Sequence, residues 1–342
     1  MSTGIDAENK LATDDVAAID ELRDDYQKLT QELAKIIVGQ EQVIEQLAIC
    51  LFARGHALLM GVPGLAKTLL VSRLAQTMSL SFSRIQFTPD LMPMDITGTD
   101  ILQENADRRR EFEFVKGPVF ANIVLADEIN RAPSKTQAAM LEAMQEHRVT
   151  VVGRPYHLDP PFFVLATQNP VEQEGTYPLP EAQLDRFMFL ISVDYPSRDE
   201  EIAIAQTTTG ATLPDLETIL DARAVLRFQD LVRRVPVPRH IYEFAVDLVR
   251  RTRPKEPESP EWLKPMVSWG AGPRAVQYLV LGARARAALT GSYMARLEDV
   301  MAVAEPVLTH RVLTTFNAES EGITSADIVR RLVQELNAEP GR

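Results

Sequence analysis

The stretch that decides the fold is Gly61-Val62-Pro63-Gly64-Leu65-Ala66-Lys67-Thr68. An apolar run at 57–60 precedes it and predicts a buried strand, and the helical spacing of 69–75 after it predicts a helix. A strand, a glycine-bearing turn, Lys-Thr and a helix are typical of a phosphate-binding loop. Successive backbone N–H groups of such a loop point at an anion, and the following helix adds the positive end of its dipole.

This loop predicts that ATP or ADP is bound with Mg²⁺ by residues 61–68 and by Leu69. Lys67 is expected to reach the β- and γ-phosphates as a point charge, and the Thr68 hydroxyl to coordinate Mg²⁺. Ala66 stands where such loops commonly have a glycine. Because we place the helix start there, we expect helical backbone angles, which alanine tolerates. The alternative is a plain glycine turn with Lys67 on the surface.

The composition is that of an ordinary globular protein, with 45% hydrophobic and 25% charged residues among 342. The net charge of −12 argues against general nucleic-acid binding. The single cysteine, Cys50, lies in an apolar helical stripe, so we expect a buried structural thiol, compatible with a reducing cytoplasm. The first residues do not show a basic segment followed by an apolar one, so we expect no secretory signal. No uncharged apolar run approaches the roughly 20 residues of a membrane span, so we expect a cytoplasmic protein.

The charged residues are unevenly distributed along the chain. Acidic side chains gather in residues 1–25, whereas residues 223–311 carry more basic than acidic side chains. This polarity could bring subunits or partners together, and ordinary solvated faces explain it equally well.

Short apolar runs separated by helical segments predict an α/β fold, a five-stranded parallel sheet between helices. The runs lie at 57–60, 84–87, 122–126, 162–166 and 187–191. The chemistry of such a sheet gathers beyond the carboxyl ends of its strands. Two connections are longer than a plain crossover, which predicts inserted hairpins near 99–117 and 149–158. We expect Phe112 and Phe114 of the first insert to pack on the core.

The strand signal fades beyond residue 197, and prolines at 236 and 238 then break a helical pattern. We therefore expect a core over 25–200, a connecting helical segment over 201–235 and an all-α domain over 236–340. Residues 1–24 are expected to be an acidic, weakly ordered leader, with helix from Asp14 as the alternative. The turn at Val38 and Gly39 could lie beside the nucleotide base or could simply join two helices.

Polar side chains follow two of the predicted strands. Asp127 and Glu128 end an apolar run, where Asp127 could hold Mg²⁺ and Glu128 could polarise the attacking water. Asn169 follows the next run and could orient that water or sense the γ-phosphate. The alternatives are an exposed acidic turn for the two carboxylates and an asparagine that caps a turn before proline.

Two arginines are placed for phosphate chemistry outside these strand ends. Arg186 follows a short proline-started helix and could project across a subunit interface to stabilise the transition state. A local ion pair with Asp185 or Glu181 is the alternative. Arg274 lies in the first turn of a proline-started helix, from which it could reach the nucleotide or simply lie on the surface.

Together these motifs resemble the MoxR family of AAA+ ATPases. The resemblance is carried by GVPGLAKT, QFTPDLMPMDITG, GPVFANIVLADEINRAPSKTQAAMLEAMQE, ATQNP, EGTYPLPEAQLDRF and GAGPRA. It implies a P-loop core with a C-terminal helical lid, two inserted hairpins and assembly into rings, usually hexamers. It also implies ATP-driven, chaperone-like remodelling of protein partners, often proteins with von Willebrand factor A domains.

The resemblance also implies a role for each matching residue. Residues 61–68 correspond to the Walker A loop, and Asp127 with Glu128 to the Walker B pair. Asn169 corresponds to sensor 1, Arg186 to the arginine finger and Arg274 to sensor 2. Whether Arg274 serves its own nucleotide or a neighbour's stays open.

Two other functions fit parts of the sequence. A nucleic-acid motor would need basic or aromatic pore loops, for which Arg108-Arg109-Arg110 is the obvious candidate, although acidic residues flank it. A small-molecule kinase would need an acceptor pocket and no arginine from a neighbouring subunit.

Overall fold

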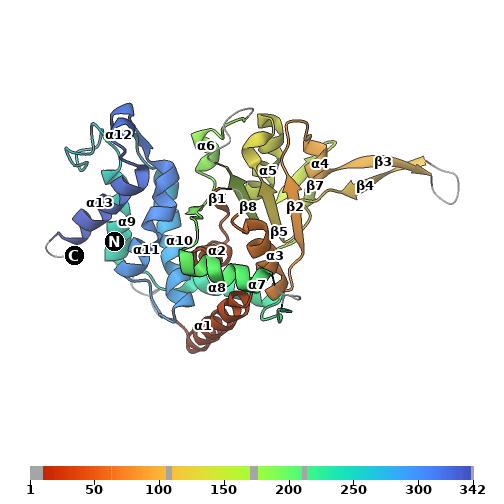
Figure 1. Ribbon diagram of the computed structural model, residues 1–342, viewed down its shortest axis with the longest axis horizontal. Coiled ribbons are helices and arrows are strands. Elements are labelled where there is room, and N and C mark those ends of the chain that lie inside the picture. The colour runs from red at the N-terminus through yellow and green to blue at the C-terminus, as the bar shows by residue number, and fades with distance from the viewer. Residues whose placement is uncertain (1–10, 63, 105–109, 170–175, 210–213, 340–342) are drawn as a thin grey trace, which may run out of the picture.

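The computed structural model describes residues 11–62, 64–104, 110–169, 176–209 and 214–339. Its centre is a five-stranded parallel sheet (Figure 1), which confirms the predicted fold class. In spatial order the strands are β2 (Phe82–Gln86), β5 (Ile123–Asp127), β8 (Phe163–Gln168), β1 (Ala57–Met60) and β9 (Phe189–Ser192). Because β8 lies between β1 and β5, the segments that follow these three strands leave the sheet side by side.

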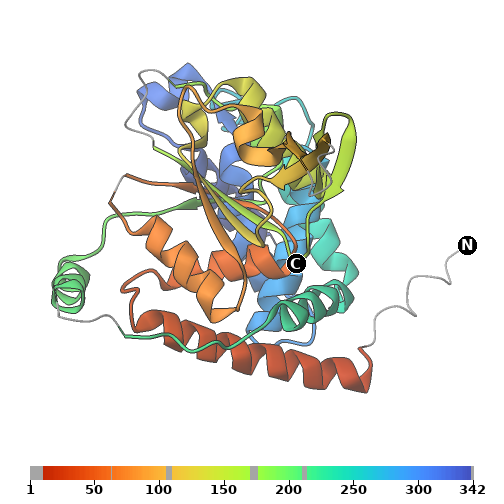
Figure 2. The same cartoon turned by 90° about the vertical axis from the view of Figure 1, so that its right-hand side faces the viewer.

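The strands are apolar throughout because helices cover both faces of the sheet (Figures 1 and 2). All residues of 123–126 are fully buried, with alternate side chains entering two separate cores. One core contains α1 (Thr13–Ala34), α2 (Glu41–Phe52) and α3 (Lys67–Thr77). The other contains α4 (Pro93–Thr97) and α5 (Ser134–Glu146).

Two antiparallel hairpins interrupt the alternation of strands and helices. They are β3 (Gly98–Glu104) with β4 (Arg110–Lys116), and β6 (Arg148–Val151) with β7 (Arg154–His157). The first projects far from the body of the molecule (Figure 1). Phe114 stacks on Tyr156 of the second hairpin at 3.8 Å between ring centroids, as packing on the core requires. Phe112 is 72% exposed, so the expectation that it also packs on the core is wrong.

After the sheet the chain is mainly helical. The elements are η1 (Ile129–Arg131), α6 (Glu181–Leu184), α7 (Arg198–Thr208), α8 (Ala222–Arg234), α9 (Arg239–Arg251), α10 (Pro273–Leu289), α11 (Leu297–Leu308), η2 (Thr309–Arg311), α12 (Phe316–Ser320) and α13 (Ser325–Asn337). The lid, expected to be all-α, also contains a short antiparallel pair formed by β10 (Val267–Trp269) and β11 (Leu313–Thr314). Within the described residues, no helix has both the length and the apolar character needed to cross a bilayer.

The acidic N-terminal region differs from the weakly ordered leader that we expected for residues 1–24. Residues 13–24 form the first part of α1, which lies against α3, α8 and α10 (Figure 2). Ile19 and Leu22 are fully buried, so this part of the helix is held by the core. Its acidic face meets the basic α8, where Arg234 pairs with Asp15 at 2.8 Å. The uneven charge along the sequence therefore has partners within the chain.

A buried carboxylate ties the lid to the core. Asp299, whose side chain is fully buried, accepts a hydrogen bond from Arg286 at 2.8 Å and another from the backbone N–H of Arg296. The same guanidinium donates to Glu45 of α2 at 3.0 Å. Because a buried charge must be compensated, Arg286 is a constraint on how α10, α11 and α2 are arranged.

We predict that Arg286→Leu lowers the free energy of unfolding by about 3 kcal/mol, since it leaves Asp299 buried without its cation. Urea unfolding of the full chain measures this. Arg234→Leu is the matched control: its pair with Asp15 is about half exposed on the arginine side, so the loss should be under about 1 kcal/mol. Equal losses in the two variants would contradict the role given to Arg286.

Candidate functional site

A cavity of about 430 Å³ opens at the carboxyl ends of β1, β8 and β5. It is lined by Gly61, Gly64, Leu65, Ala66, Lys67, Thr68, Leu69, Arg84, Asp127, Glu128, Thr167, Gln168 and Asn169. The structure therefore brings together most of the residues predicted to bind a nucleotide. Val62 does not line the cavity, and Pro63 lies outside the described residues.

The loop after β1 contains two residues with positive φ angles. Gly64 has φ +89°, and Ala66 has φ 54° and ψ 21°, in the left-handed region. The expectation of helical angles at Ala66 is wrong because α3 begins one residue later, at Lys67. A non-glycine residue in that region costs about 1–2 kcal/mol. Gly61 is required for another reason, since a Cβ there would lie 2.5 Å from the carbonyl oxygen of Val193.

Lys67 faces the two acidic residues across the cavity. Its ammonium group donates to the carbonyl oxygen of Gly61, which keeps the side chain folded back over the loop. Partial burial lowers the pKa of Lys67, while the nearby charges of Asp127 and Glu128 oppose that shift. The charged side chains at the cavity are therefore two cations, Lys67 and Arg84, and two carboxylates, Asp127 and Glu128.

Asp127 is oriented by partners on both neighbouring strands. Its Oδ1 accepts a hydrogen bond from the Thr167 hydroxyl of β8 at 2.6 Å. Its Oδ2 accepts from Nε and Nη2 of Arg84 of β2, at 3.0 and 2.6 Å. Our sequence analysis missed both partners. The alternation of Arg84-Ile85-Gln86 was a usable signal, because it places the two polar side chains on one face of β2.

Glu128 has left-handed angles, φ 55° and ψ 48°, so the chain turns sharply at the end of β5. Its backbone N–H donates to the same Thr167 hydroxyl oxygen at 2.8 Å. The carboxylate accepts from Gln86 Nε2 at 2.8 Å and from Arg131 Nη1 at 3.1 Å. Adjacent strand residues normally face opposite ways, and this turn explains how both acids reach one cavity.

The donor set fits Mg²⁺. The Thr68 hydroxyl and the Asp127 carboxylate supply oxygen ligands at the cavity wall, as this cation requires. In the part of the chain that the structure describes, no cluster of three or more His, Cys, Asp or Glu side chains could hold a metal. A site with one carboxylate suits a cation that takes its other ligands from phosphates and water. Asn169, 9% exposed, lines the same cavity just beyond β8.

The turn proposed to lie beside the base is next to the cavity and does not line it. Gly39 has φ +72° and lies against Glu200 of α7, where a Cβ would be 2.2 Å from the carboxylate oxygen. Gln40 connects this turn to the phosphate loop by donating to the carbonyl oxygen of Leu65 at 3.3 Å. Val38 is half-buried in the same turn.

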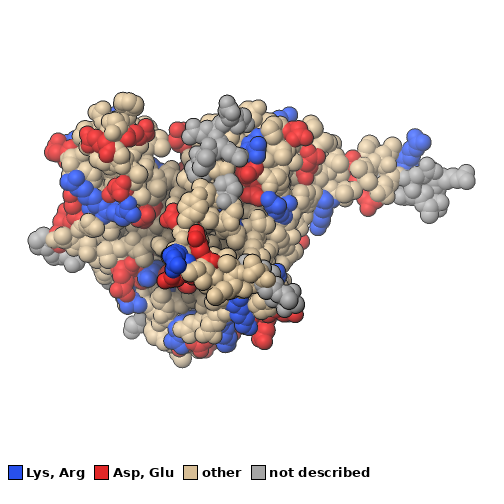
Figure 3. All heavy atoms as spheres, in the orientation of Figure 1, with Lys and Arg blue, Asp and Glu red and all other residues tan. Residues whose placement is uncertain are grey.

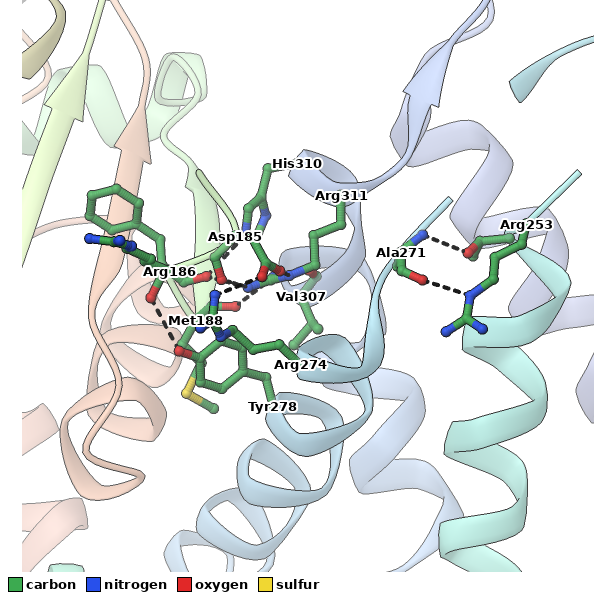
Figure 4. Close-up of polar contacts among 12 residues, drawn as sticks. Asp185, Arg186, Met188, Arg253, Ala271, Arg274, Tyr278, Val307, His310 and Arg311 are labelled. Carbon is green, nitrogen blue, oxygen red and sulfur yellow. Dashed lines mark hydrogen bonds and ion pairs between the residues drawn. The ribbon is translucent and has the colours of Figure 1, made fainter. Parts of the chain in front are cut away.

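Neither predicted arginine lines the cavity of its own chain. Arg186 points to α5, where it donates to the carbonyl oxygen of Leu141 at 3.4 Å beside a separate hollow of about 400 Å³. Arg274 pairs with Asp185 at 2.7 Å (Figure 4). Asp185 is therefore paired with the lid. The local alternative for Arg186 was an ion pair with Asp185 or Glu181, whereas the contact found for its guanidinium is the Leu141 carbonyl.

Comparisons with known proteins show the family and agree with the fold. Residues 56–189 match the family described as "ATPase family associated with various cellular activities (AAA)", and residues 261–332 match the AAA lid domain. A crystal structure of a Cytophaga hutchinsonii protein is 41% identical, with a TM-score of 0.86, over 93% of this chain and 96% of that one.

Two curated relatives carry the name of the family. Chaperone MoxR1 of Mycobacterium tuberculosis is 44% identical over 90% of this chain and 82% of that protein. Protein MoxR of Methylorubrum extorquens is 32% identical over 86% of this chain and 90% of that protein. The chain belongs to the MoxR family of AAA+ ATPases.

Proposed function

We propose that this chain hydrolyses ATP with Mg²⁺ and uses the energy, within an oligomeric ring, to remodel or assemble specific protein partners. The observation that carries the proposal is the meeting of Lys67, Thr68, Asp127, Glu128 and Asn169 at one cavity. These residues supply a phosphate-binding cation, two metal ligands, a general base and an amide that orients water. Phosphoryl transfer needs such positioning and charge stabilisation more than it needs covalent chemistry.

Each side chain has a separate task in the reaction. Lys67 and the amides of the loop bind the β- and γ-phosphates, while Thr68 and Asp127 hold Mg²⁺. Mg²⁺, when bound, neutralises the charge on the phosphates. Glu128 accepts a proton from the attacking water, and its contacts with Gln86 and Arg131 orient the carboxylate.

Assembly into a ring is supported by the position of Arg186. Because its guanidinium lies on α5, away from the cavity of its own chain, it is placed to act on a neighbouring subunit. We propose a hexamer. A relative named as a chaperone supports protein clients, among which we include proteins with von Willebrand factor A domains. The buried, reduced Cys50 fits the cytoplasm as the compartment.

Nothing in the described structure favours the nucleic-acid motor. Basic and acidic side chains are interspersed over the face that Figure 3 presents. Nucleic-acid binding requires a continuous basic surface that releases counterions from the phosphate backbone. Arg110 is exposed on β4, whereas Arg108 and Arg109 lie outside the described residues.

We predict that Glu128→Gln keeps ATP binding and lowers kcat at least a hundredfold, the usual contribution of a general base. Phosphate release measures turnover, and a fluorescent ATP analogue measures binding. Glu243→Gln, an exposed glutamate of α9 paired with Arg239, is the control and should retain full activity. Undiminished hydrolysis by Glu128→Gln would remove the assigned base.

We also predict that Arg186→Ala lowers kcat by about a thousandfold or more without weakening ATP binding, and that mixing it with Lys67→Ala protein restores hydrolysis. The restored sites would combine an intact cavity from one chain with Arg186 from its neighbour. A mixture of Glu128→Gln and Lys67→Ala is the control: every cavity is then defective, so activity should stay absent. If the Arg186→Ala mixture is as inactive as the control mixture, the arginine does not act across an interface.

A further inference from the structure

The segment that carries Arg186 is held by the lid. Residues 185–188 join α6 to β9, and all four of their backbone carbonyl oxygens accept hydrogen bonds from lid side chains (Figure 4). Tyr278 donates to the carbonyl of Arg186 at 3.1 Å. Arg311 donates to the other three carbonyls, at distances from 2.6 to 3.3 Å. The backbone position of Arg186 is therefore set from outside the core.

The Asp185 carboxylate strengthens this attachment. Its Oδ2 accepts from Arg274 at 2.7 Å and its Oδ1 from Arg311 at 2.8 Å. Arg311 is 5% exposed; burial lowers its pKa, and the Asp185 carboxylate opposes that shift. A buried guanidinium must have its donors satisfied; the segment 185–188 supplies most of the acceptors, and the Val307 carbonyl of the lid supplies another. Moving this segment away from the lid would therefore leave a buried cation unpaired.

Two of these contacts with residues 185 and 186 come from side chains on one face of α10. Arg274 and Tyr278 are four residues apart, so they lie one above the other on the helix. The start of this helix is itself anchored, because Ala271 donates to the Thr252 hydroxyl and accepts from Arg253, both at 2.9 Å (Figure 4). A movement of α10 would therefore be passed directly to residues 185 and 186.

Asp185 and Arg186 turn in opposite directions. The Asp185 carboxylate faces the lid, while the Arg186 side chain points away from the lid to α5 (Figure 4). The two are adjacent on a short connection, so a shift of the backbone at Asp185 displaces the guanidinium of Arg186. After this connection β9 pairs with β1, which leads into the phosphate loop.

We propose that Asp185, Tyr278 and Arg311 are positioning residues through which the lid sets the position of Arg186. Arg274 acts in the same way, through Asp185 of its own chain. This inference rests on the proposed ATPase function and on a catalytic role for Arg186. In this arrangement the lid of one subunit affects hydrolysis at the nucleotide of its neighbour, because Arg186 is the group that reaches that nucleotide.

Tyr278→Phe tests the inference with the smallest change, since it removes one hydrogen bond and keeps the ring. We expect kcat to fall about two- to tenfold, the effect of one hydrogen bond, with KM for ATP and the unfolding midpoint unchanged. Tyr242→Phe is the matched control: this lid hydroxyl accepts from Arg284 at 3.2 Å and should be dispensable. An unchanged kcat in Tyr278→Phe, or a rise in KM instead, would overturn the proposal.

A double-mutant cycle separates positioning from general support of the fold. Single-turnover hydrolysis with excess protein follows slow rates in the Arg186→Ala background. There Tyr278→Phe and Asp185→Asn should cause no further loss, because no guanidinium is left to position. The same fold-loss in both backgrounds would show that the lid contacts act independently of Arg186.

The outcomes also separate this inference from the function on which it rests. Absence of hydrolysis by the unmodified protein would reject the ATPase function itself. Normal hydrolysis by Arg186→Ala would leave the ATPase in place and reject the route through Arg186. A loss in Arg186→Ala together with full activity in Tyr278→Phe and Asp185→Asn would reject the positioning role alone.

Discussion

The parallel pairing of β1, β8 and β5 is the interaction on which the rest of the structure depends. Because these neighbouring strands end at one edge, the phosphate loop, Asn169 and Asp127 converge without help from distant loops. The backbone at the start of the phosphate loop packs closely against the segment after β9, because Gly61 has no room for a side chain beside Val193. Helices cover both faces of the sheet, so the strands must be apolar along their length. The polar residues of the site are therefore found at the ends of the strands.

The parts of the fold and site that depend on local sequence could be predicted. Each strand is a short apolar run. Asp127 directly follows one of these runs, and Lys67 and Thr68 end the glycine-bearing loop that follows another. The alternation at Arg84-Ile85-Gln86 indicates which face of β2 is polar, but it does not indicate the partner of Arg84. That partner, Asp127, and the contact of Asp127 with Thr167 could not be predicted, because the paired residues lie about 40 positions apart in sequence. The left-handed angles of Ala66 also depend on how the loop is closed between its strand and its helix, which residue type alone does not reveal.

The lid shows the same division between local pattern and long-range contact. Its helices follow from the sequence, whereas the attachment of Arg274 and Arg311 to Asp185 joins residues about 90 and 126 positions apart. The acidic start of the chain is another region where composition was misleading. Its polar composition suggested weak order, whereas residues 13–24 form part of a helix that buries Ile19 and Leu22. Arg186 and the lid are therefore linked through ion pairs and buried backbone contacts, which periodicity cannot predict.

The most direct measurement is an X-ray structure of the protein crystallised with Mg²⁺ and a non-hydrolysable ATP analogue. We expect the phosphates to lie in the cradle of residues 61–68 and Mg²⁺ to lie between Thr68 and Asp127. An Arg186 side chain from a neighbouring subunit should complete the pocket. Nucleotide bound elsewhere on the protein, or a cradle left empty at saturating nucleotide, would contradict the central claim.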